Sequence, residues 1–556
     1  MNKFILLFVL LCPCLLAAPQ QSPDSDSIIV NIRPFPITSN WDGSGFLPVK
    51  IEIANHSHTR GKWRLAISGQ GNLSHLGDRI ATPIIFELNP GEAVNTVAYM
   101  PPLNGSSYTR LCYTRRCLLS ISGTGLQHPV SQNISAQFQS RKSSCFFASP
   151  DLNKKWQEGL HKKIISSYSD YKDSCYSGDM KEWPADERIY SAFSFGVVTR
   201  EYYDSLDQSY LDAISRWIAK GGILCIFDPN EKTPRTFVDM GMGSILTIGD
   251  ITKADVEKTV DLLDREIRDI HERKLDLPNS WKDYITTPPT SILAVTLLAF
   301  AVLVGPLSLF VWAPAGNRQR LFILIPAFSL GFCAMIILAI FVTEGIGGTG
   351  ARKVIVYLNP EKNYASIVQS QICRTAIIPS VSFPLDDKTE FYGSKYKMNG
   401  MQESWESITP NERSHGEASG RWFSSRSTIN HQLKATVPTR ARISIVGMKN
   451  GAPVIQSTVP CELTDFIYLD SDQNTIWKAA SVPQGQPVTL TKSIEEEKDK
   501  KKIKDSVFPG YYLRSENFQA KGKTNSLAPL PTHPEIKWEK DQVIFMGPVA
   551  NETTKQ

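Results

Sequence analysis

Hydrophobic residues are concentrated near the middle of the chain in two uninterrupted runs. Neither Ser291–Trp312 nor Leu321–Val342 contains a charged residue. Each run has about the 20 residues that an α-helix needs to cross a hydrocarbon layer of roughly 30 Å. Their prolines, Pro306 and Pro326, are tolerated in membrane helices when neighbouring groups satisfy the freed carbonyls. The alternative is a pair of core helices in a large soluble domain. The pattern favours a transmembrane hairpin over 289–344, with helices at 290–312 and 321–343.

Basic residues predict how this hairpin is oriented. The short connection between the runs carries Arg318 and Arg320, and loops rich in arginine stay in the cytoplasm. The first residues, 1–18, combine Lys3, an apolar core and small residues, which is the pattern of a secretory signal peptide. Whether this peptide is cleaved is left open by Pro19. Both signals agree on a multi-pass protein of the cell membrane, inner if the cell has two, with most of its mass extracytoplasmic.

Alternation of apolar and polar residues marks the region before the hairpin as β-structure. In "FLPVKIEIANHS", Val49, Ile51 and Ile53 alternate with polar residues, which is the period of a half-buried strand. Four similar segments follow, separated by Gly, Pro and Asn. The pattern predicts an immunoglobulin-like β-sandwich over 24–140.

Two pairs of side chains in this sandwich have possible chemistry. Cys112 and Cys117 enclose only "YTRR", so they are a candidate disulfide that closes a β-hairpin in an oxidising compartment. Two unpaired thiols are the alternative. His56 and His58 lie two residues apart, but no third metal ligand is near in sequence, so they are interpreted as turn residues.

The hydrophobic period changes from two to about four after Arg141. In "YLDAISRWIAKGGILCIFD", Leu211, Ile214 and Trp217 form one helical face, and Gly221 is placed to end the helix. The apolar run that follows is typical of a strand buried on both faces of a parallel sheet. The pattern predicts an α/β domain over 141–283.

The helix and the Gly-Gly turn carry a family resemblance. This segment looks like the one that ends in a W-V-x-x-G-G-x-L pattern in class I glutamine-amidotransferase-like domains of bacterial membrane proteins. In those proteins a β-sandwich comes first, the α/β domain second, then a membrane segment with an internal Gly-Pro, then more β-structure. Here the Gly-Pro is Gly305-Pro306. The resemblance implies the same order of parts, in proteins that are mostly uncharacterised.

The residues needed for amidotransferase catalysis are not in the expected pattern. Active relatives use a cysteine nucleophile on a glycine-flanked elbow, activated by a histidine and an acid. Cys145, Cys175 and Cys225 lack the flanking glycines, and Cys225 lies inside an apolar strand. The histidines, His161 and His271, both lie within predicted helices. We therefore expect a domain that is not an enzyme and that has no cofactor and no metal.

If this domain binds a ligand, the carboxyl ends of its strands are the expected place. The residues at these ends are Ser149, Asp151, Arg200 and Asp228. Each has a simpler interpretation: a helix cap, a first-turn acid and two solvated loop charges.

Alternating segments return after the hairpin. Val354, Val356 and Leu358 begin a predicted β-rich domain over 351–520. Within it, "DSDQN" lacks the glycine and distal glutamate of a calcium loop and is interpreted as a hairpin turn. Residues 521–556 are rich in proline and polar residues and are expected to form a tail.

Composition narrows the function without identifying it. The 556 residues carry a formal net charge of only +5, spread along the chain, so nucleic-acid binding is not expected. The favoured hypothesis is a membrane-anchored extracytoplasmic scaffold or sensor that binds a partner, another envelope or membrane protein beside the lipid bilayer. The alternatives are an accessory subunit of an envelope transporter and a hydrolase or amidotransferase.

Overall fold

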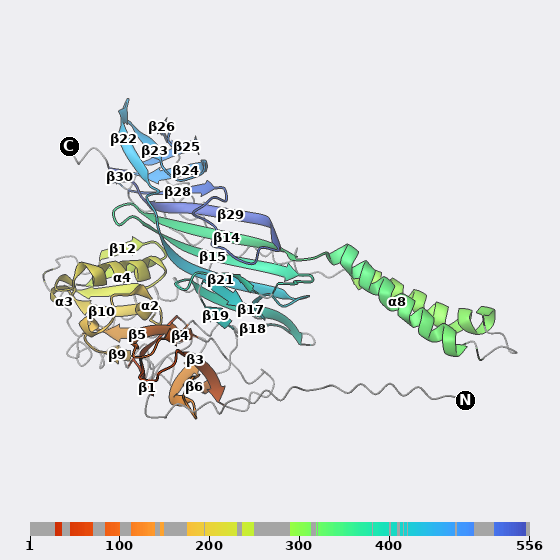
Figure 1. The fold of residues 1–556 in the computed structure, drawn as a ribbon. Helices are drawn as coiled ribbons and strands as arrows, with labels where there is room; N and C mark the ends of the chain where they lie inside the picture. The colour runs from red at the N-terminus through yellow and green to blue at the C-terminus, as the bar shows by residue number, and fades with distance from the viewer. Residues whose placement is uncertain are drawn as a thin grey trace.

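The structure is a computed structural model in which β-strands dominate (Figure 1). It describes residues 28–35, 45–70, 84–100, 113–138, 145–148, 175–193, 195–228, 230, 236–248, 290–312, 319, 321–380, 382–399, 402–407, 412–414, 416–419, 421–472, 475–493 and 516–551. The predicted signal peptide, Ser149, Asp151, Arg318 and Arg320 lie outside these residues.

Two antiparallel sheets open the described chain. One contains β1 (Ile28–Pro34), β2 (Leu47–Asn55) and β5 (Ala93–Met100); the other contains β4 (Ile84–Leu88), β3 (Gly61–Gln70), β6 (Tyr113–Gly123) and β7 (Val130–Phe138). Val49, Ile51 and Ile53 are fully buried and share one core with Trp63 and Leu119 of the second sheet. The alternation therefore identified the inward face of β2 correctly.

The predictions for the histidine pair and the cysteine pair of this region have different outcomes. His56 and His58 are exposed in the turn after β2, where Asn55 Nδ2 donates to the carbonyl of Thr59 at 2.9 Å, so the turn interpretation is confirmed. The four residues expected to form a hairpin loop before Cys117 instead extend along β6, which pairs with β3 and β7. That loop prediction is wrong, and Cys112 lies outside the described residues.

A six-stranded sheet follows, ordered β12-β13-β11-β10-β8-β9. Its strands are β8 (Cys145–Phe147), β9 (Cys175–Ser177), β10 (Phe195–Thr199), β11 (Ile223–Phe227), β12 (Thr236–Met240) and β13 (Gly243–Ile248), and β12 alone is antiparallel to its neighbour. The short helical segments near it are η3 (Met180–Glu182), α2 (Glu187–Tyr190), α3 (Arg200–Asp204) and α4 (Gln208–Ala219).

The predicted fold class is wrong. Strands far outnumber helices across the described residues, and the helices beside this sheet have only 4, 5 and 12 residues. The chain is a β-rich multidomain protein, not one with an α/β amidotransferase-like domain. The local prediction for α4 holds, because Ile214, Trp217 and Ile218 are buried and Gly221 has a φ of +117°.

The apolar centre of the sequence forms a helical arm that projects from the β-sheets (Figure 1). Its segments are α7 (Thr290–Val302), the π-helix η4 (Leu303–Trp312) and α8 (Leu321–Glu344). Over the described residues, no helix combines the length and the apolar character needed to cross a membrane. The predicted transmembrane hairpin and the multi-pass membrane localisation are therefore corrected. One reason is local: the first apolar run is divided between α7, which has only 13 residues, and the π-helix η4, which contains Pro306.

The largest sheet follows the arm and has ten strands, ordered β18-β17-β21-β15-β14-β29-β28-β24-β25-β27. Their bounds are β14 (Gly348–Asn359), β15 (Tyr364–Thr375), β17 (Glu390–Asn399), β18 (Gln402–Ser407), β21 (Thr428–Pro438), β24 (Leu463–Leu469), β25 (Ile476–Val482), β27 (Thr491–Lys492), β28 (Asn517–Gly522) and β29 (Ile536–Pro548). The antiparallel pair β24 and β25 flanks "DSDQN", which confirms the hairpin-turn prediction.

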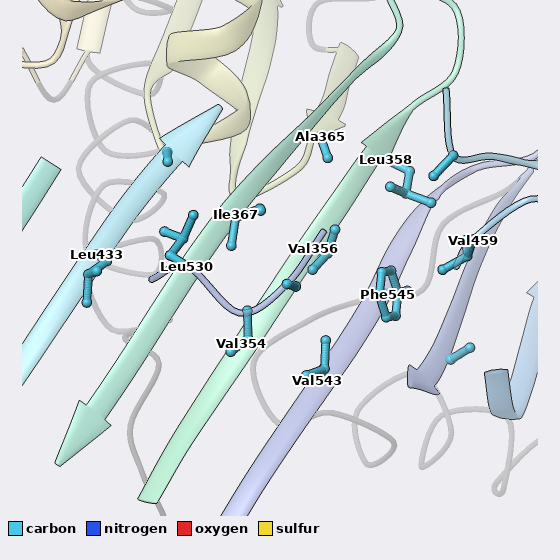
Figure 2. Close-up of a cluster of buried hydrophobic side chains, with 14 of the residues drawn as sticks. Val354, Val356, Leu358, Ala365, Ile367, Leu433, Val459, Leu530, Val543 and Phe545 are labelled. Atoms are coloured by element: carbon cyan, nitrogen blue, oxygen red, sulfur yellow. The ribbon is translucent and has the colours of Figure 1, made fainter. Parts of the chain in front are cut away.

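Two small sheets complete this part. One contains β16 (Ser382–Pro384), β19 (Glu412–Ser414) and β20 (Glu417–Ser419); the other contains β22 (Ile443–Lys449), β23 (Ala452–Ser457), β26 (Pro487–Thr489) and β30 (Ala550–Asn551). A 3-10 turn, η6 (Arg421–Phe423), precedes β21. Figure 2 shows part of the core, with Val354, Ile367 and Phe545 on neighbouring strands and Leu530 on the connection beside them.

The polar tail predicted for 521–556 is wrong. Residues 536–548 form β29, which runs parallel to β14 and antiparallel to β28 near the centre of the sheet. Val543, Ile544 and Phe545 are buried, and this short apolar run outweighs the polar residues around it. The last part of the chain is therefore a structural strand of the largest sheet.

The six-stranded and ten-stranded sheets are packed against each other. Ala219 at the end of α4 and Met242 before β13 share an apolar cluster with Ile355, Tyr357 and Ile544 of the large sheet. Figure 1 shows α4 and β12 beside β14 and β15. This contact places the end of α4 against the large sheet, where the charged site described next is buried.

Candidate functional sites

Of the residues predicted as ligand-facing, the structure describes Arg200 and Asp228, which directly follow the paired carboxyl ends of the parallel strands β10 and β11. Arg200 Nε contacts Asp204 at 3.0 Å, and both side chains are exposed. Asp228 Oδ1 accepts the backbone N–H of Asn230 at 2.9 Å. Arg200 is therefore paired within α3, and Asp228 is engaged in the turn that follows β11.

A buried charge cluster occupies the boundary between the two large sheets. Lys220, directly after α4, places its Nζ 2.8 Å from Glu390 Oε1 of β17 and 3.3 Å from Glu187 Oε1 of α2. The three side chains are only 3%, 5% and 7% exposed, respectively. Lys434 of β21 acts electrostatically on Glu390 and completes a set of two cations and two anions. We call these four residues the ionic junction.

Burial and charge compete within the ionic junction. Burial alone raises the pKa of Glu390, but Lys220, Lys434 and the hydroxyl of Tyr392 together lower that pKa. Burial alone lowers the pKa of Lys220, yet Glu187 and Glu390 raise it overall. Burial lowers the pKa of Lys434, and Glu390 only partly offsets this. Lys220 and Glu390 are therefore charged at neutral pH and hold each other in that state.

The N-terminal sandwich also reaches the ionic junction. The Tyr392 hydroxyl donates to Glu390 Oε2 at 3.0 Å and accepts the backbone N–H of Gly45 at 3.1 Å. Gly45 has a φ of +72°, and a Cβ there would lie 2.2 Å from the carbonyl carbon of Ser191. Phe46 N–H donates to Ser191 Oγ at 2.8 Å. Only glycine fits this approach, so one short segment connects the sandwich to both other units.

Sequence reasoning missed the ionic junction. Lys220 stands beside the helix-ending glycines, where a lysine normally is solvated, and Glu390 is 170 residues away. No local pattern joins them. The sequence contained only a weak indication. Lys220 lies between a helix and a strand that are both predicted to be buried, so its side chain has little access to water.

The helical arm presents the second candidate site. Large apolar side chains are strongly exposed on it: Phe310 at 81%, Phe322 at 85%, Ile323 at 76% and Leu330 at 75%. The α7 and α8 helices contact each other through Phe300 and Phe332, whose ring centroids are 4.9 Å apart. That contact leaves most of the arm's described apolar side chains without cover.

Two of the described cysteines are poor candidates for nucleophilic chemistry. Cys225 and Cys373 are fully buried, and burial raises the pKa of both thiols. A thiol that does not ionise at neutral pH is a poor nucleophile. Cys145 and Cys175 lie opposite each other on the parallel strands β8 and β9.

Comparisons with known proteins do not identify a family. No family model matches the chain, and no curated protein matches it. Among solved structures, the mu-homology domain of yeast delta-COP-I is 10% identical, covers 36% of this chain and 96% of its own, and has a TM-score of 0.15. A β-D-mannosidase from Dictyoglomus thermophilum is 9% identical, covers 85% and 75% of the two chains and has a TM-score of 0.18. These likenesses are too weak to carry an argument about function.

Proposed function

We propose that this protein is a non-catalytic scaffold that binds a partner protein through its helical arm. The exposed apolar side chains of the arm are the observation that carries the proposal. A monomeric soluble protein rarely exposes a continuous apolar surface of more than a few hundred Å². A surface of this kind is normally covered by a binding partner.

The arm suggests what the partner offers. Exposed apolar residues come from both α7 and α8, including Val295, Leu298 and Ile337. A helix that is apolar on all sides requires apolar contacts on all sides. A Cβ at Gly331 would meet nothing within 4 Å, so another helix can approach the backbone closely there. Apolar helices of another protein satisfy both conditions.

Charge argues against a second copy of the chain as that partner. The connection between η4 and α8 contains two arginines and no acidic residue. Two copies with their arms aligned side by side would bring like charges together, which is unfavourable. A different protein with an acidic group at that level is a better fit.

The proposal assigns no catalysis to the β-rich body. The ionic junction is buried, and Lys220 bridges Glu187 and Glu390 from different elements, which suits a structural contact between sheets. It keeps the sheets in a fixed arrangement from which the arm projects.

Crosslinking followed by reconstitution tests the proposal. A photoreactive residue at Leu330 in the full chain captures the neighbour in cells, and mass spectrometry identifies it. Binding is then measured between the two purified proteins. Burying a phenylalanine contributes about 1.5–3 kcal/mol. Phe322→Glu should therefore weaken binding at least roughly tenfold, at about 1.4 kcal/mol for each factor of ten.

The matched control is Met448→Glu, which changes an equally apolar side chain, 64% exposed, on β22 in the body. Binding should be unchanged in this variant. Three results would contradict the proposal: crosslinks only to a second copy, association only with protein-free lipid vesicles, or a reconstituted pair equally weakened by both variants.

A further inference from the structure

A connection crosses the buried face of the large sheet between two neighbouring strands. Residues 523–535 join β28 to β29, and we call them the strap. Ala528 and Leu530 of the strap lie in the main apolar core (Figure 2 shows Leu530 beside Ile367 and Leu433). The strap ends next to the base of the arm, where Gly348 N–H donates to the carbonyl of Glu535 at 3.2 Å.

A chain of hydrogen bonds joins the strap to a buried histidine. Leu530 N–H donates to Gln369 Oε1 at 2.9 Å, and Gln369 Nε2 donates to Gln371 Oε1 at 2.7 Å. Gln371 Nε2 then lies 3.4 Å from His431 Nδ1, and His431 Nε2 lies 3.1 Å from the carbonyl of Trp422. Gln369, Gln371 and His431 are at most 1% exposed.

The two ends of this chain fix its direction. A backbone N–H such as that of Leu530 only donates, and a carbonyl such as that of Trp422 only accepts. Each amide between them must therefore present its oxygen toward the strap and its nitrogen toward the histidine. His431 Nε2 carries the proton, and Nδ1 is an acceptor. The arrangement works only while His431 is neutral.

Protonation of His431 would disturb every bond in the chain. A proton on Nδ1 would face the NH₂ group of Gln371. If the Gln371 amide rotated by half a turn, its NH₂ group would face the NH₂ group of Gln369. If the Gln369 amide rotated as well, its NH₂ group would face the N–H of Leu530. A buried donor without an acceptor is costly, so the charge on the ring cannot be accommodated without releasing the strap.

A second histidine holds the strap itself in the same way. His533 Nε2 lies 3.1 Å from the carbonyl of Ser380, and Glu535 N–H donates to His533 Nδ1 at 3.3 Å. This ring is 2% exposed and also uses one nitrogen as donor and the other as acceptor.

The surroundings of both rings are largely uncharged. The ring of Phe423 lies between them, with centroids 4.5 Å from His431 and 5.1 Å from His533. Phe391 also packs on His431, and Phe383 packs on His533. Glu535 and His533 both belong to the strap and would move together. Burial lowers the pKa of His431 to about 3, and no charged side chain contributes to that shift.

We propose that the strap is an acid-released element, which detaches from the sheet when His431 takes up a proton. Detachment removes the Glu535 carbonyl from the base of the arm and exposes the apolar face beneath Leu530. The inference does not depend on what the arm binds.

Hydrogen exchange of the full chain at pH 6.5 and pH 4.5 tests the proposal. Proton uptake by one histidine on opening raises the opening constant up to about tenfold per pH unit below its ordinary pKa of roughly 6.5. After correction for intrinsic exchange, proton uptake by His431 should therefore lower the protection of the Leu530 amide by up to about 50-fold between these pH values. The Val356 amide in the central strand β14 should keep its protection.

Two variants separate the proposed cause from general acid sensitivity. His431→Gln keeps a neutral donor toward the Trp422 carbonyl, so its Leu530 protection should depend much less on pH. His58→Gln, at an exposed turn, should behave as the natural chain does. The proposal is overturned if Leu530 protection stays constant in the natural chain, if Val356 loses protection in parallel, or if His431→Gln shows the full loss. The comparison of Leu530 with Val356 in the natural chain decides the matter even if a variant does not fold.

Discussion

The ionic junction gives a sharp prediction about stability. Glu390→Gln removes one negative charge without changing the size of the side chain. Lys220 then keeps only Glu187, at 3.3 Å, as an anionic partner, while Lys434 remains nearby with the same sign. The junction changes from two cations and two anions to an excess of one buried cation.

The magnitude follows from burial. Lys220 and Glu390 are 3% and 5% exposed at a separation of 2.8 Å, so water cannot take the place of the lost carboxylate. Removing one partner of a buried ion pair costs about 3–5 kcal/mol. For comparison, breaking the exposed pair of Arg200 and Asp204 should cost no more than about 0.5 kcal/mol. Asp204→Asn is therefore the control.

Native-state hydrogen exchange is the suitable assay, because a chain with several sheets need not unfold in one step. The readouts are the amides of α4 and the Gly45 amide, which donates to Tyr392. The double variant Lys220→Met with Glu390→Gln restores charge balance, so it should lose less than the sum of the two single changes. Losses below about 1 kcal/mol for Glu390→Gln, or strict additivity, would show that the junction is not a coupled buried unit.

Further predictions concern single positions. Gly45→Ala should destabilise the contact between the sandwich and the six-stranded sheet by more than the ~1–2 kcal/mol that a left-handed backbone alone costs, because its Cβ would meet Ser191 at 2.2 Å; amide exchange at Phe46 measures this. In the folded protein Cys333, which is exposed, should react with a thiol reagent far faster than buried Cys225, and equal rates would refute the burial argument. Because its pKa is lowered in the folded state, Glu390 stabilises the fold above its ordinary pKa near 4.5, and this contribution should disappear as pH falls below that value; Glu390→Gln should flatten that part of the stability curve.

Local patterns predicted local structure well. The face of α4 and the buried side of β2 were read correctly, because period and burial are set by neighbours in sequence. Contacts between distant segments left no such trace. Gln369 and Gln371 lie at positions that polarity alone assigns to the surface, yet both are fully buried. Gln369 bonds the strap and Gln371, and Gln371 faces His431.

The same limit explains the larger errors. The pairing of β29 with β14 depends on the other strands of the sheet, so the sequence of β29 alone does not predict it. The polar residues before Val543 also make this segment look like a solvent-exposed tail. The helical arm was misread for a different reason. Apolar composition and the length of the two runs were taken to indicate a lipid bilayer. They show only that the helices require apolar contacts.

The base of the arm contacts both the large sheet and the strap. Gly347 donates its N–H to the carbonyl of Ile377 at 2.8 Å, and a Cβ there would lie 2.2 Å from the Glu535 carbonyl oxygen. The arm is thus fixed to a loop of the large sheet on one side and to the end of the strap on the other. A load on the arm from a bound partner must pass through these contacts into a sheet whose position is set by the ionic junction. If the arm binds a partner as we propose, its rigid connection to the large sheet requires the strap to stay docked, and therefore requires His431 to stay neutral.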